Sequence, residues 1–380
     1  MTIPKPVALA DDFGFTDEHD LLRQTVRRWL NDNSPLTEAR RLVDDDTGYD
    51  PDKWAQIVEM GWPGLVAPEA HGGVELDYLS LVLVLEETGR CLLPSPLLAT
   101  ILAGIAIDAT GDDDQRKRWC AKIAQGEVIA TVGLTEPSNS WELAGIEATA
   151  TNDGDGYVLN GTKTHVMWAR AAGVMVAPFR VADELGLFVV ELSDGGVTIS
   201  DEVVIDSTRR AGRVELSDVK VGAANRLGGD ATDAIRLLHS RGQVLLAAEM
   251  VGAADEMLVR TRDYANERKQ FNRQISSFQA VKHPIVDVML AVENARSLVT
   301  AAAATLDTQP TRAEAPARMA KAAANDALAF SADRGVQFHG GYGFTWDCDA
   351  HFYFKRSLWG NSMLGDSRHH RRHLADLLLG

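Results

Sequence analysis

The first third of the chain has the hydrophobic spacing of α-helices. Within residues 18–30 apolar side chains recur every three or four positions and acidic residues precede the first turn, as an amphipathic helix and its dipole favour. Residues 54–60 and 77–89 repeat this spacing, and an acidic cluster at 112–114 predicts a short helix that follows it. We therefore predict a helical N-terminal domain over residues 1–126.

Between residues 127 and 226 the pattern changes to short β-branched runs separated by turn residues. Asp-Gly-Asp-Gly at 153–156 and Asn-Gly at 160–161 are sequences typical of hairpin turns. Because no helical period interrupts the runs, a small antiparallel sheet or barrel fits better than alternating strands and helices. We predict a middle antiparallel β-domain over residues 127–226, with strands that include residues 128–132, 156–159, 173–176, 187–190 and 213–217.

The last part of the chain is helical again and rich in alanine. Helical runs cover residues 231–267, 279–306 and 317–337, and a short helix is expected after Asp366. Ala248 and Gly252 lie four residues apart on the first run, so another helix can approach closely there. Helices of this length usually form a bundle. The predicted fold class is α+β: an N-terminal helical domain, a middle antiparallel β-domain, and a C-terminal four-helix bundle over residues 227–380.

Composition narrows the class of protein further. The 380 residues include 38 Lys and Arg against 54 Asp and Glu, a formal net charge of −16. Such a surface repels phosphate backbones and anionic lipid, so we expect neither a nucleic-acid partner nor a membrane partner. The longest apolar stretch, residues 92–107, contains two prolines and is too short to span a bilayer.

The cysteine count and the N-terminus favour a cytoplasmic location. Three scattered cysteines are too few for a disulfide framework or a zinc site, and this usage fits a reducing compartment. Residues 1–12 carry charge and two prolines without an apolar core, so we expect no signal peptide. The sequence thus predicts a soluble, cytoplasmic, multidomain protein.

Three segments offer groups that can bind a ligand. Residues 135–138 (Thr-Glu-Pro-Ser) form a turn whose hydroxyls and N–H groups can donate to the polar edge of a flat heterocycle, although an ordinary loop between strands would look the same. Arg268 ends a long helix, where it either binds an anion or only complements the helix dipole. The glycines at 340 and 341 either permit close approach of a ligand or simply end a helix.

Together with one further segment, these resemble the acyl-CoA dehydrogenase family. The strongest matches are Arg-Lys-Gln-Phe at 268–271, followed by Phe-Gln at 278–279, and Gln-Phe-His-Gly-Gly-Tyr-Gly at 337–343. Weaker matches are Leu-Thr-Glu-Pro at 134–137 and Gly-Thr-Lys at 161–163. Any one alone is a poor signal, but all four stand in this order on a helix–sheet–helix layout, and the resemblance covers nearly the whole chain.

The resemblance implies FAD as the cofactor. In the family the loop after the first strand bonds the pyrimidine side of the flavin, which nominates Thr135, Ser138 and Ser140. The arginine after the long helix would meet the pyrophosphate, and the Gly-Gly turn would lie against the ADP part of a flavin held mainly by a neighbouring subunit. The remaining nominated contacts are Arg268, Gln270, Phe271, Gln279, Gln337, Gly340 and Gly341. The family therefore implies a homo-oligomer, either a dimer or a tetramer.

The implied reaction is α,β-dehydrogenation of an acyl-CoA thioester. A carboxylate removes the α-proton while the β-hydrogen leaves as hydride to flavin N5, and the electrons pass to an electron-transfer flavoprotein or a similar acceptor. The carboxylate must be positioned and desolvated, because the α-proton is only weakly acidic until the thioester carbonyl is polarised.

The expected glutamate is absent from both family positions. Gly365 matches the usual glutamate after the Gly-Gly turn and Asp366 follows it, while Gly242 matches a second family position near the start of the long helix. Gln243 stands for an arginine that helps to hold CoA, and His165 stands for the usual aromatic residue of the β-domain. These replacements hint at a branched or bulky acyl group.

Two hypotheses about the base follow. In the first, Asp366 is the base, shifted by one residue, although capping the helix that follows is a competing role for it. In the second, the chain is the non-catalytic subunit of a heterotetramer whose related subunit supplies the base, as in some actinobacterial relatives that act on steroid side-chain thioesters. A flavin-free scaffold subunit is a third possibility.

Other cofactor classes are not indicated. No strand runs into Gly-x-Gly-x-x-Gly, and neither a Walker loop nor Cys-x-x-Cys is present. The tract His-His-Arg-Arg-His at 369–373 has no carboxylate or thiol close in the sequence at ligand spacing. We therefore interpret it as a solvated, cationic face of the last helix and expect no metal site.

Overall fold

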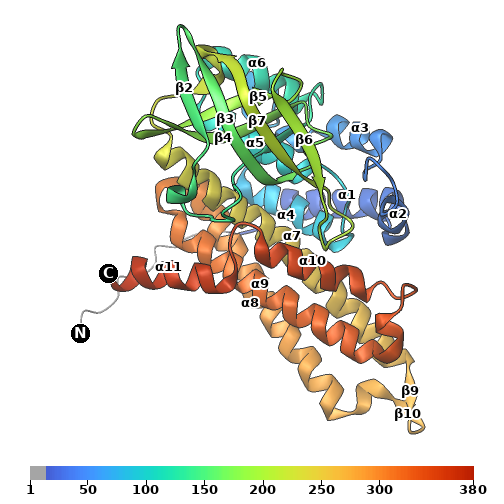
Figure 1. The fold of residues 1–380 in the computed structure, drawn as a ribbon. Helices are drawn as coiled ribbons and strands as arrows, with labels where there is room; N and C mark the ends of the chain where they lie inside the picture. The colour runs from blue at the N-terminus through green and yellow to red at the C-terminus, as the bar shows by residue number, and fades with distance from the viewer. Residues whose placement is uncertain (1–13) are drawn as a thin grey trace.

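The computed structural model describes residues 14–380 of the chain. Figure 1 shows helices, a twisted sheet and a long helical bundle, in the order of the sequence. The sheet lies over one end of the bundle, and the bundle extends away from it to a small hairpin (Figure 1). This arrangement confirms the predicted α+β fold with a helical domain, a β-domain and a helical bundle.

Side-chain caps begin several of the N-terminal helices. Thr16 forms a capping box with His19, and aspartates at 50, 77 and 112 accept backbone N–H groups in the first turns of later helices. Such caps bond donors that a helix leaves without an internal acceptor. The helices are α1 (Asp17–Asn33), α2 (Leu36–Leu42), α3 (Pro51–Glu59), α4 (Tyr78–Arg90), α5 (Leu97–Thr110) and α6 (Asp113–Ala124).

Helix α5 was not predicted from the sequence pattern. Its residues are apolar on all sides and almost all buried, so no 3.6-residue alternation marks it as a helix. The apolar stretch at 92–107 therefore supplies a core helix, which begins directly after the second of the two prolines. Within residues 14–380 no helix combines the length and the apolar character that a membrane span requires.

The middle part is a single sheet in the order β6-β7-β3-β2-β4-β5-β8, with β1 beside β4. Most neighbouring strands are antiparallel, as predicted, but β1 and β2 each run parallel to β4. The strands are β1 (Ala130–Val132), β2 (Thr149–Asp153), β3 (Gly156–Met167), β4 (Val174–Val181), β5 (Glu184–Glu191), β6 (Val197–Glu202), β7 (Ala211–Gly222) and β8 (Arg226–Leu227).

One of the two predicted hairpin turns is correct and the other is wrong. Residues 154–155 form the two-residue connection between β2 and β3. Asn160 and Gly161 instead lie inside β3, where the pairing with β7 shifts. Gly161 has a φ of +139°, and a Cβ there would lie 2.5 Å from the Cβ of Ala148. Glycine therefore permits a bulge and close packing at this position, and the chain does not reverse.

In the C-terminal bundle, α9 packs against each of the other helices described there. The helices are α7 (Thr232–Glu267), α8 (Gln279–Thr308), α9 (Glu314–His339), α10 (Ala350–Ser362) and α11 (Ser367–Leu379). The short hairpin of β9 (Lys269–Gln270) and β10 (Arg273–Gln274) joins α7 to α8 at the far end of the bundle (Figure 1). Neither α10 nor this hairpin was predicted from the sequence. Short 3₁₀ turns connect the longer elements: η1 (Trp62–Gly64), η2 (Glu69–His71), η3 (Leu143–Gly145), η4 (Ala223–Asn225), η5 (Ile275–Ser277), η6 (Pro310–Arg312) and η7 (Gly340–Phe344).

Helices α4 and α7 cross at two glycines. A Cβ at Gly252 would lie 1.8 Å from the carbonyl oxygen of Glu86, and one at Gly89 would lie 1.9 Å from that of Glu249. The predicted close approach of another helix at Gly252 is therefore confirmed. Beside this crossing the carboxylate of Glu249 forms a buried ion pair with Arg209, which lies between β6 and β7. The ion pair joins the sheet to the bundle.

Candidate active site

A cavity of about 530 Å³ lies where the sheet meets the end of α10 and the start of α11. The cavity is lined by three positions that were singled out in the sequence: Thr135 after β1, His165 on β3, and the turn at 365–366. The indole rings of Trp141 and Trp359 form further parts of the wall. These side chains come from distant parts of the chain, so the tertiary fold alone assembles them.

The wall that carries Thr135 is held by a buried ion pair. Glu136 accepts from Nζ of Lys163 at 2.6 Å and from the backbone N–H of Glu147 at 2.7 Å. Lys163 is fully buried, and burial lowers its pKa to about 8 while the charge of Glu136 opposes that shift. Thr135 is buried beside this pair, and its hydroxyl donates to the carbonyl of Thr164 at 2.8 Å. The two weaker family motifs are therefore bonded to each other.

The loop after Glu136 presents the two other nominated hydroxyls. Oγ of Ser138 accepts from the N–H of Ser140 at 3.4 Å, and Oγ of Ser140 accepts from the N–H of Glu142 at 3.1 Å. Both hydroxyls thus accept within their own loop and keep a proton to donate. The indole N–H of Trp141 donates to the carbonyl of Ser362 at 3.1 Å, so the loop is tied to α10.

His165, the replacement for the family's aromatic residue, is part of a polar group in the cavity wall. Its Nδ1 lies 2.9 Å from the carboxylate of Glu202, and its Nε2 lies 3.0 Å from Oδ1 of Asn139. His165 and Asn139 have φ values of +53° and +54°, a backbone region that costs free energy for residues other than glycine. Nothing in the sequence pattern marked Asn139 or Glu202 as neighbours of His165.

Asp366 caps α11 at the edge of the cavity. Its carboxylate accepts the backbone N–H of His369 at 2.6 Å, and the residue is exposed. The capping role that competed with the catalytic one is therefore confirmed. The same residue lines the cavity, so its position is compatible with both roles.

A buried ammonium lies behind this turn. Lys321 of α9 is fully buried, and its Nζ donates to Oδ1 of Asn325 at 2.5 Å and to the carbonyls of Gly360 and Gly365 at 2.8 and 3.3 Å. Burial lowers the pKa of Lys321 to about 7, and the negative charge of Asp366 opposes that shift. Three acceptors match the three N–H groups of a protonated lysine. Nothing in the sequence pattern indicated that Lys321 would lie here.

The space beside Gly242, the second family position for a glutamate, is occupied by a leucine side chain. A Cβ at Gly242 would lie 2.9 Å from Cδ1 of Leu364, which itself has a φ of +57°. A carboxylate side chain at position 242 would therefore have to displace Leu364. The next residue, Gln243, is buried, and its Oε1 has no hydrogen-bond partner among the described residues. That oxygen can accept from a bound ligand without breaking an existing bond.

The other nominated FAD contacts lie at the far end of the bundle. Arg268 caps the end of α7, and no carboxylate within residues 14–380 is close enough to pair with it. Gly340 ends α9 with a φ of +62° and a ψ of −142°, and a Cβ at Gly340 or Gly341 would meet nothing within 4 Å. Tyr264 stacks on His339 with ring centroids 4.2 Å apart, so the ends of α7 and α9 lie together. An arginine with no acidic partner in the described chain and an open glycine turn suit a diphosphate ligand.

The structure thus divides the nominated residues into two groups. Thr135, Ser138 and Ser140 lie in the loop beside the cavity under the sheet. The second group lies around the β9–β10 hairpin and the end of α9, remote from the sheet (Figure 1). Its members are Arg268, Gln270, Phe271, Gln279, Gln337, Gly340 and Gly341. Gln270, Gln279 and Gln337 are exposed, and the Phe271 ring is 86% exposed at the hairpin tip.

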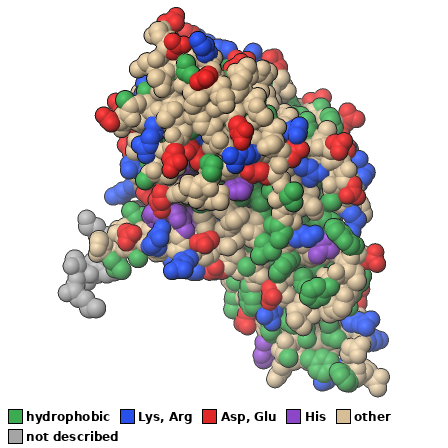
Figure 2. Space-filling view, viewed as in Figure 1, with side chains coloured by type: hydrophobic (Ala, Val, Ile, Leu, Met, Phe, Trp, Pro, Cys, Tyr) green, Lys and Arg blue, Asp and Glu red, His purple; other side chains and the backbone are tan. Residues whose placement is uncertain are grey.

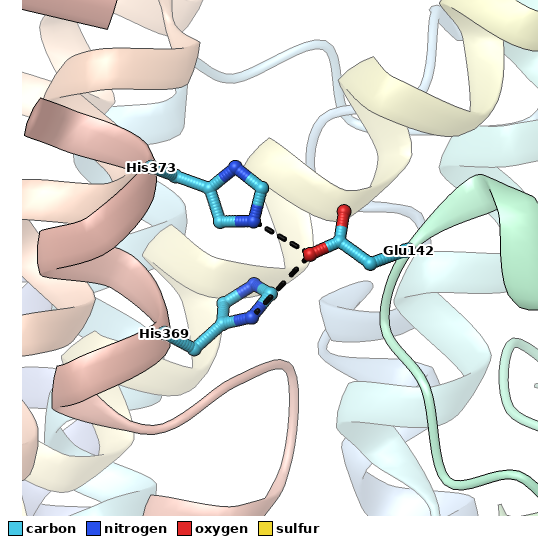
Figure 3. A group of neighbouring side chains, drawn as sticks. All are labelled: Glu142, His369 and His373. Carbon is cyan, nitrogen blue, oxygen red and sulfur yellow. Dashed lines mark hydrogen bonds and ion pairs between the residues drawn. The ribbon is translucent and has the colours of Figure 1, made fainter. Parts of the chain in front are cut away.

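The interpretation of the tract 369–373 as a solvated face is wrong in part. His370 is fully buried, with Nε2 3.0 Å from the carbonyl oxygen of Gly365. His369 and His373 are half-buried and face Glu142 (Figure 3). Glu142 is far away in the sequence, so spacing along the chain could not reveal this carboxylate.

The fold and the cavity define the protein's class. A helical domain is followed by a β-domain and a helical bundle, and the last two enclose a cavity that is lined by both a hydroxyl-bearing loop and a carboxylate. This is the architecture of the flavin-dependent enzymes that oxidise acyl thioesters.

Comparison with protein families gives the particular family. The model for the acyl-CoA dehydrogenase N-terminal domain matches residues 16–127, that for the middle domain matches residues 131–219, and that for the C-terminal domain matches residues 233–379. The chain belongs to the acyl-CoA dehydrogenase family, whose members bind FAD and act as oxidoreductases on CH–CH groups.

Three related proteins illustrate the similarity. The acyl-CoA dehydrogenase IpdE2 of Mycolicibacterium smegmatis is 31% identical over 360 residues, which cover 94% of this chain and 98% of that protein. A chain of the ChsE4-ChsE5 complex from Mycobacterium tuberculosis superposes with a TM-score of 0.89 at 28% identity and covers 96% of this chain and 98% of its own length. A chain of the Tcur3481-Tcur3483 steroid ACAD superposes with a TM-score of 0.87 at 29% identity, covering 95% and 97%.

Proposed function

We propose that this chain carries out FAD-dependent α,β-dehydrogenation of an acyl-CoA thioester in the cavity beside Thr135, with Asp366 as the base. The observation that carries the proposal is that one cavity is lined by both Thr135 and Asp366. Bound FAD would supply the acceptor for the β-hydride. The chain's own residues would then orient the flavin, hold the thioester and take the α-proton.

The loop hydroxyls orient the flavin in this proposal. Ser138 and Ser140 use their oxygens as acceptors within the loop and retain their hydroxyl protons, which suits donation to the polar edge of the ring. Thr135 is anchored to Thr164 and fixed by the neighbouring ion pair. The cavity wall is therefore ordered before a ligand binds, which reduces the entropic cost of binding.

Asp366 accepts and holds the α-proton in this proposal. The N–H of His369 donates to its carboxylate, and the ammonium of Lys321 donates to the carbonyl oxygen of the preceding residue, Gly365. An exposed carboxylate is a weak base because water stabilises its charge. The acyl group must therefore exclude water from Asp366 when it binds.

The far end of the bundle holds the diphosphate part of FAD for a neighbouring subunit. Gly242 packs against Leu364 beside the cavity, and Arg268 lies 26 residues further along α7 (268 − 242), roughly 39 Å at about 1.5 Å per residue. The Gly340–Gly341 turn lies at the same end of the bundle as Arg268, so one flavin cannot reach from this end to the cavity of the same chain, and each complete site combines two chains. Large apolar side chains are exposed around this region, and Figure 2 shows hydrophobic surface gathered over the bundle. They include Phe271, Tyr342, Phe344 and Trp346. Such a surface is typical of a subunit interface.

A second candidate function is the non-catalytic subunit of a heteromeric acyl-CoA dehydrogenase. Leu364 fills the space at Gly242, and Asp366 is exposed and engaged in a helix cap, so neither family position holds a buried carboxylate. The related ChsE4-ChsE5 structure is described as a complex of two different chains. In this case a related subunit supplies the base in a heterotetramer. A flavin-free scaffold is disfavoured by the open glycine turn and by Arg268.

We propose a bulky, sterol-derived acyl thioester as the substrate and an electron-transfer flavoprotein as the acceptor. The cavity of about 530 Å³ and the related steroid ACAD support a large acyl group. A thermal-shift screen across acyl-CoA lengths tests this choice, and preference for a short linear chain would contradict it. We also propose a cytoplasmic location, which the three buried free thiols support.

The deciding experiment compares the chain alone with the chain co-expressed with any natural partner. We expect the purified protein to contain bound flavin, and we expect acyl-CoA to bleach the flavin colour. In Asp366→Asn the rate of bleaching should fall by at least about 100-fold, because removing a general base lowers the rate by about 10²–10⁴-fold. The matched control is Asp112→Asn, since Asp112 caps α6 in the same way, away from the cavity.

The two candidate functions give different results in this experiment. If Asp366→Asn bleaches as fast as the parent, Asp366 is not the base and the heteromeric function is supported, with one flavin per two chains. If the chain and its complexes bind no FAD at all, both candidate functions are wrong.

A further inference from the structure

We propose that Glu142, His369 and His373 form a binding site for a divalent transition-metal ion such as Zn²⁺. One nitrogen of each imidazole and one carboxylate oxygen lie within 4.8 Å of one another. Figure 3 shows both imidazoles projecting from one helix, α11, toward the carboxylate on the opposite loop. The cluster borders the candidate active-site cavity through His369, but the proposal does not depend on the proposed function.

The spacing of the two histidines places them on one face of the helix. Residues four apart on an α-helix lie one above the other, and the ring centroids of His369 and His373 are 4.5 Å apart. The same spacing of two histidines on a helix, with a carboxylate from another element, forms zinc sites in enzymes. In this chain the carboxylate comes from the loop that precedes η3.

The distances allow an ion to enter with small side-chain movements. Oε1 of Glu142 lies 2.7 Å from Nε2 of His373 and 3.8 Å from Nδ1 of His369. An ion about 2.0–2.2 Å from each of three ligands holds them roughly 3.3–3.6 Å apart in tetrahedral geometry. Of the two observed separations, 2.7 Å is shorter than this range and 3.8 Å is longer. Three protein ligands leave a fourth position for water.

The ligand types select the class of ion. Two imidazole nitrogens and one carboxylate suit Zn²⁺ and its first-row neighbours, whereas Mg²⁺ and Ca²⁺ prefer oxygen ligands. All three side chains are partly exposed, so an ion can reach them from solvent.

Two arginines lie next to the cluster, and one of them can turn away from an ion. Arg318 lies 3.4 Å from Nε2 of His369, but its guanidinium is already paired with Glu314 at 2.9 Å. Arg372 lies 3.6 Å from Oε1 of Glu142 and its side chain is 68% exposed. Because Arg372 can turn into water at little cost, the carboxylate remains available to the ion.

An ion at this site would join two walls of the cavity. Glu142 follows Trp141, and His369 follows the turn that carries Asp366; Trp141, Asp366 and His369 all line the cavity. The ion therefore holds the loop of the middle domain against α11, which a thermal-shift measurement detects as metal-dependent stabilisation.

The test uses the full chain without a polyhistidine tag, stripped with a chelator and titrated with Zn²⁺ against a chromophoric competitor. We expect one Zn²⁺ per chain and a higher melting temperature with Zn²⁺. Glu142→Gln and His373→Ala should each weaken binding at least about tenfold, the size of effect that accompanies loss of a contact in a metal site. The matched controls are Glu147→Gln on the same loop and His283→Ala on α8, both exposed and outside the cluster; they should bind as the parent does.

A second variant distinguishes coordination from a general loss of stability. His373→Cys keeps a metal ligand at this position, so with Co²⁺ it should show a thiolate-to-metal absorption band that the parent lacks. The proposal is overturned if Zn²⁺ binds no more weakly to Glu142→Gln and His373→Ala than to the controls. It is also overturned if the parent binds no Zn²⁺, or if the cysteine variant shows no such band; the two histidines then only pair with the carboxylate.

Discussion

Glu136 and Lys163 show how a single buried pair determines the shape of the cavity wall. The carboxylate bonds the lysine and two backbone N–H groups of the returning loop, so one side chain fixes both ends of the segment that carries Ser138 and Ser140. The sequence marked both residues only as parts of weak motifs. Glu136 and Lys163 meet because their strand and loop lie side by side in the fold, and their spacing along the chain does not indicate this.

The replacement Lys163→Met should lower the free energy of unfolding by about 3–5 kcal/mol, because it leaves the buried Glu136 carboxylate without its counter-charge. Chemical denaturation measures this change. The control Lys220→Met removes an exposed lysine from a surface pair with Asp153 and should change stability by less than about 0.5 kcal/mol. Equal effects of the two variants would contradict the role assigned to the buried pair.

His370 should make the protein sensitive to acid. Burial, with help from the charge of Lys321, lowers its pKa to about 2 from the usual 6.5. Below pH 6.5 the unfolded chain therefore binds a proton that the folded chain does not, and stability falls as the pH decreases, by up to about 1.4 kcal/mol per pH unit.

The variant His370→Asn should flatten this pH dependence, measured as the free energy of unfolding between about pH 6 and pH 4 in the presence of a chelator. The control His283→Asn changes an exposed histidine on α8 and should retain the parent's slope. An unchanged slope in His370→Asn would show that other groups cause the acid sensitivity.

Among the elements, amphipathic spacing and long alanine-rich runs predicted most of the helices, and a shorter helix with neither signal was missed. The long runs that became α7, α8 and α9 were recognised. Helix α5 was missed because it is buried on all sides. The bulge at Asn160–Gly161 was mistaken for a turn because the same dipeptide permits both. The spacing of apolar residues indicates which face of a helix or strand is exposed, but it does not indicate which other elements pack against it.

The crossing of α4 and α7 tolerates no side chain at its centre. Gly252→Ala should lower the free energy of unfolding by about 1–3 kcal/mol or more, because the added Cβ would lie 1.8 Å from the carbonyl oxygen of Glu86 and must push the helices apart. Gly104→Ala is the matched control, since its Cβ would meet only Ile123 at 3.6 Å. In a helix that change should be neutral or stabilising by up to about 1 kcal/mol. Thermal unfolding of the two variants checks the difference, and equal stabilities would contradict the close crossing.

For the whole molecule, one group of nominated FAD contacts lies where the sheet meets the bundle, and the other lies at the hairpin end of the bundle (Figure 1). The cavity group belongs to the sheet and the loop beside it, and the second group to the hairpin end of the bundle. A complete flavin site therefore requires an oligomer in the function proposed above. For the same reason, a single chain carries only part of the flavin site.

The variant Arg268→Gln should weaken FAD binding roughly 10- to 150-fold in the complete oligomer, because a hydrogen bond to a charged group contributes about 1.5–3 kcal/mol. Quenching of flavin fluorescence measures the affinity. The control Arg262→Gln removes an exposed arginine from the same helix end, where it pairs with Asp263, and should bind FAD as the parent does. Equal affinities in both variants would place the diphosphate elsewhere.

The amino-acid sequence was enough to predict the order of helices and sheet, the family, and the residues of the open glycine turn, because these depend on local spacing and on motifs of adjacent residues. The tertiary structure alone decided that Leu364 occupies the space at Gly242, that Lys321 lies behind Asp366, and that Glu142 faces two histidines of the last helix. Each of these contacts joins residues far apart in the chain. Their distances are fixed by how the elements pack, and packing leaves no periodic trace in the sequence.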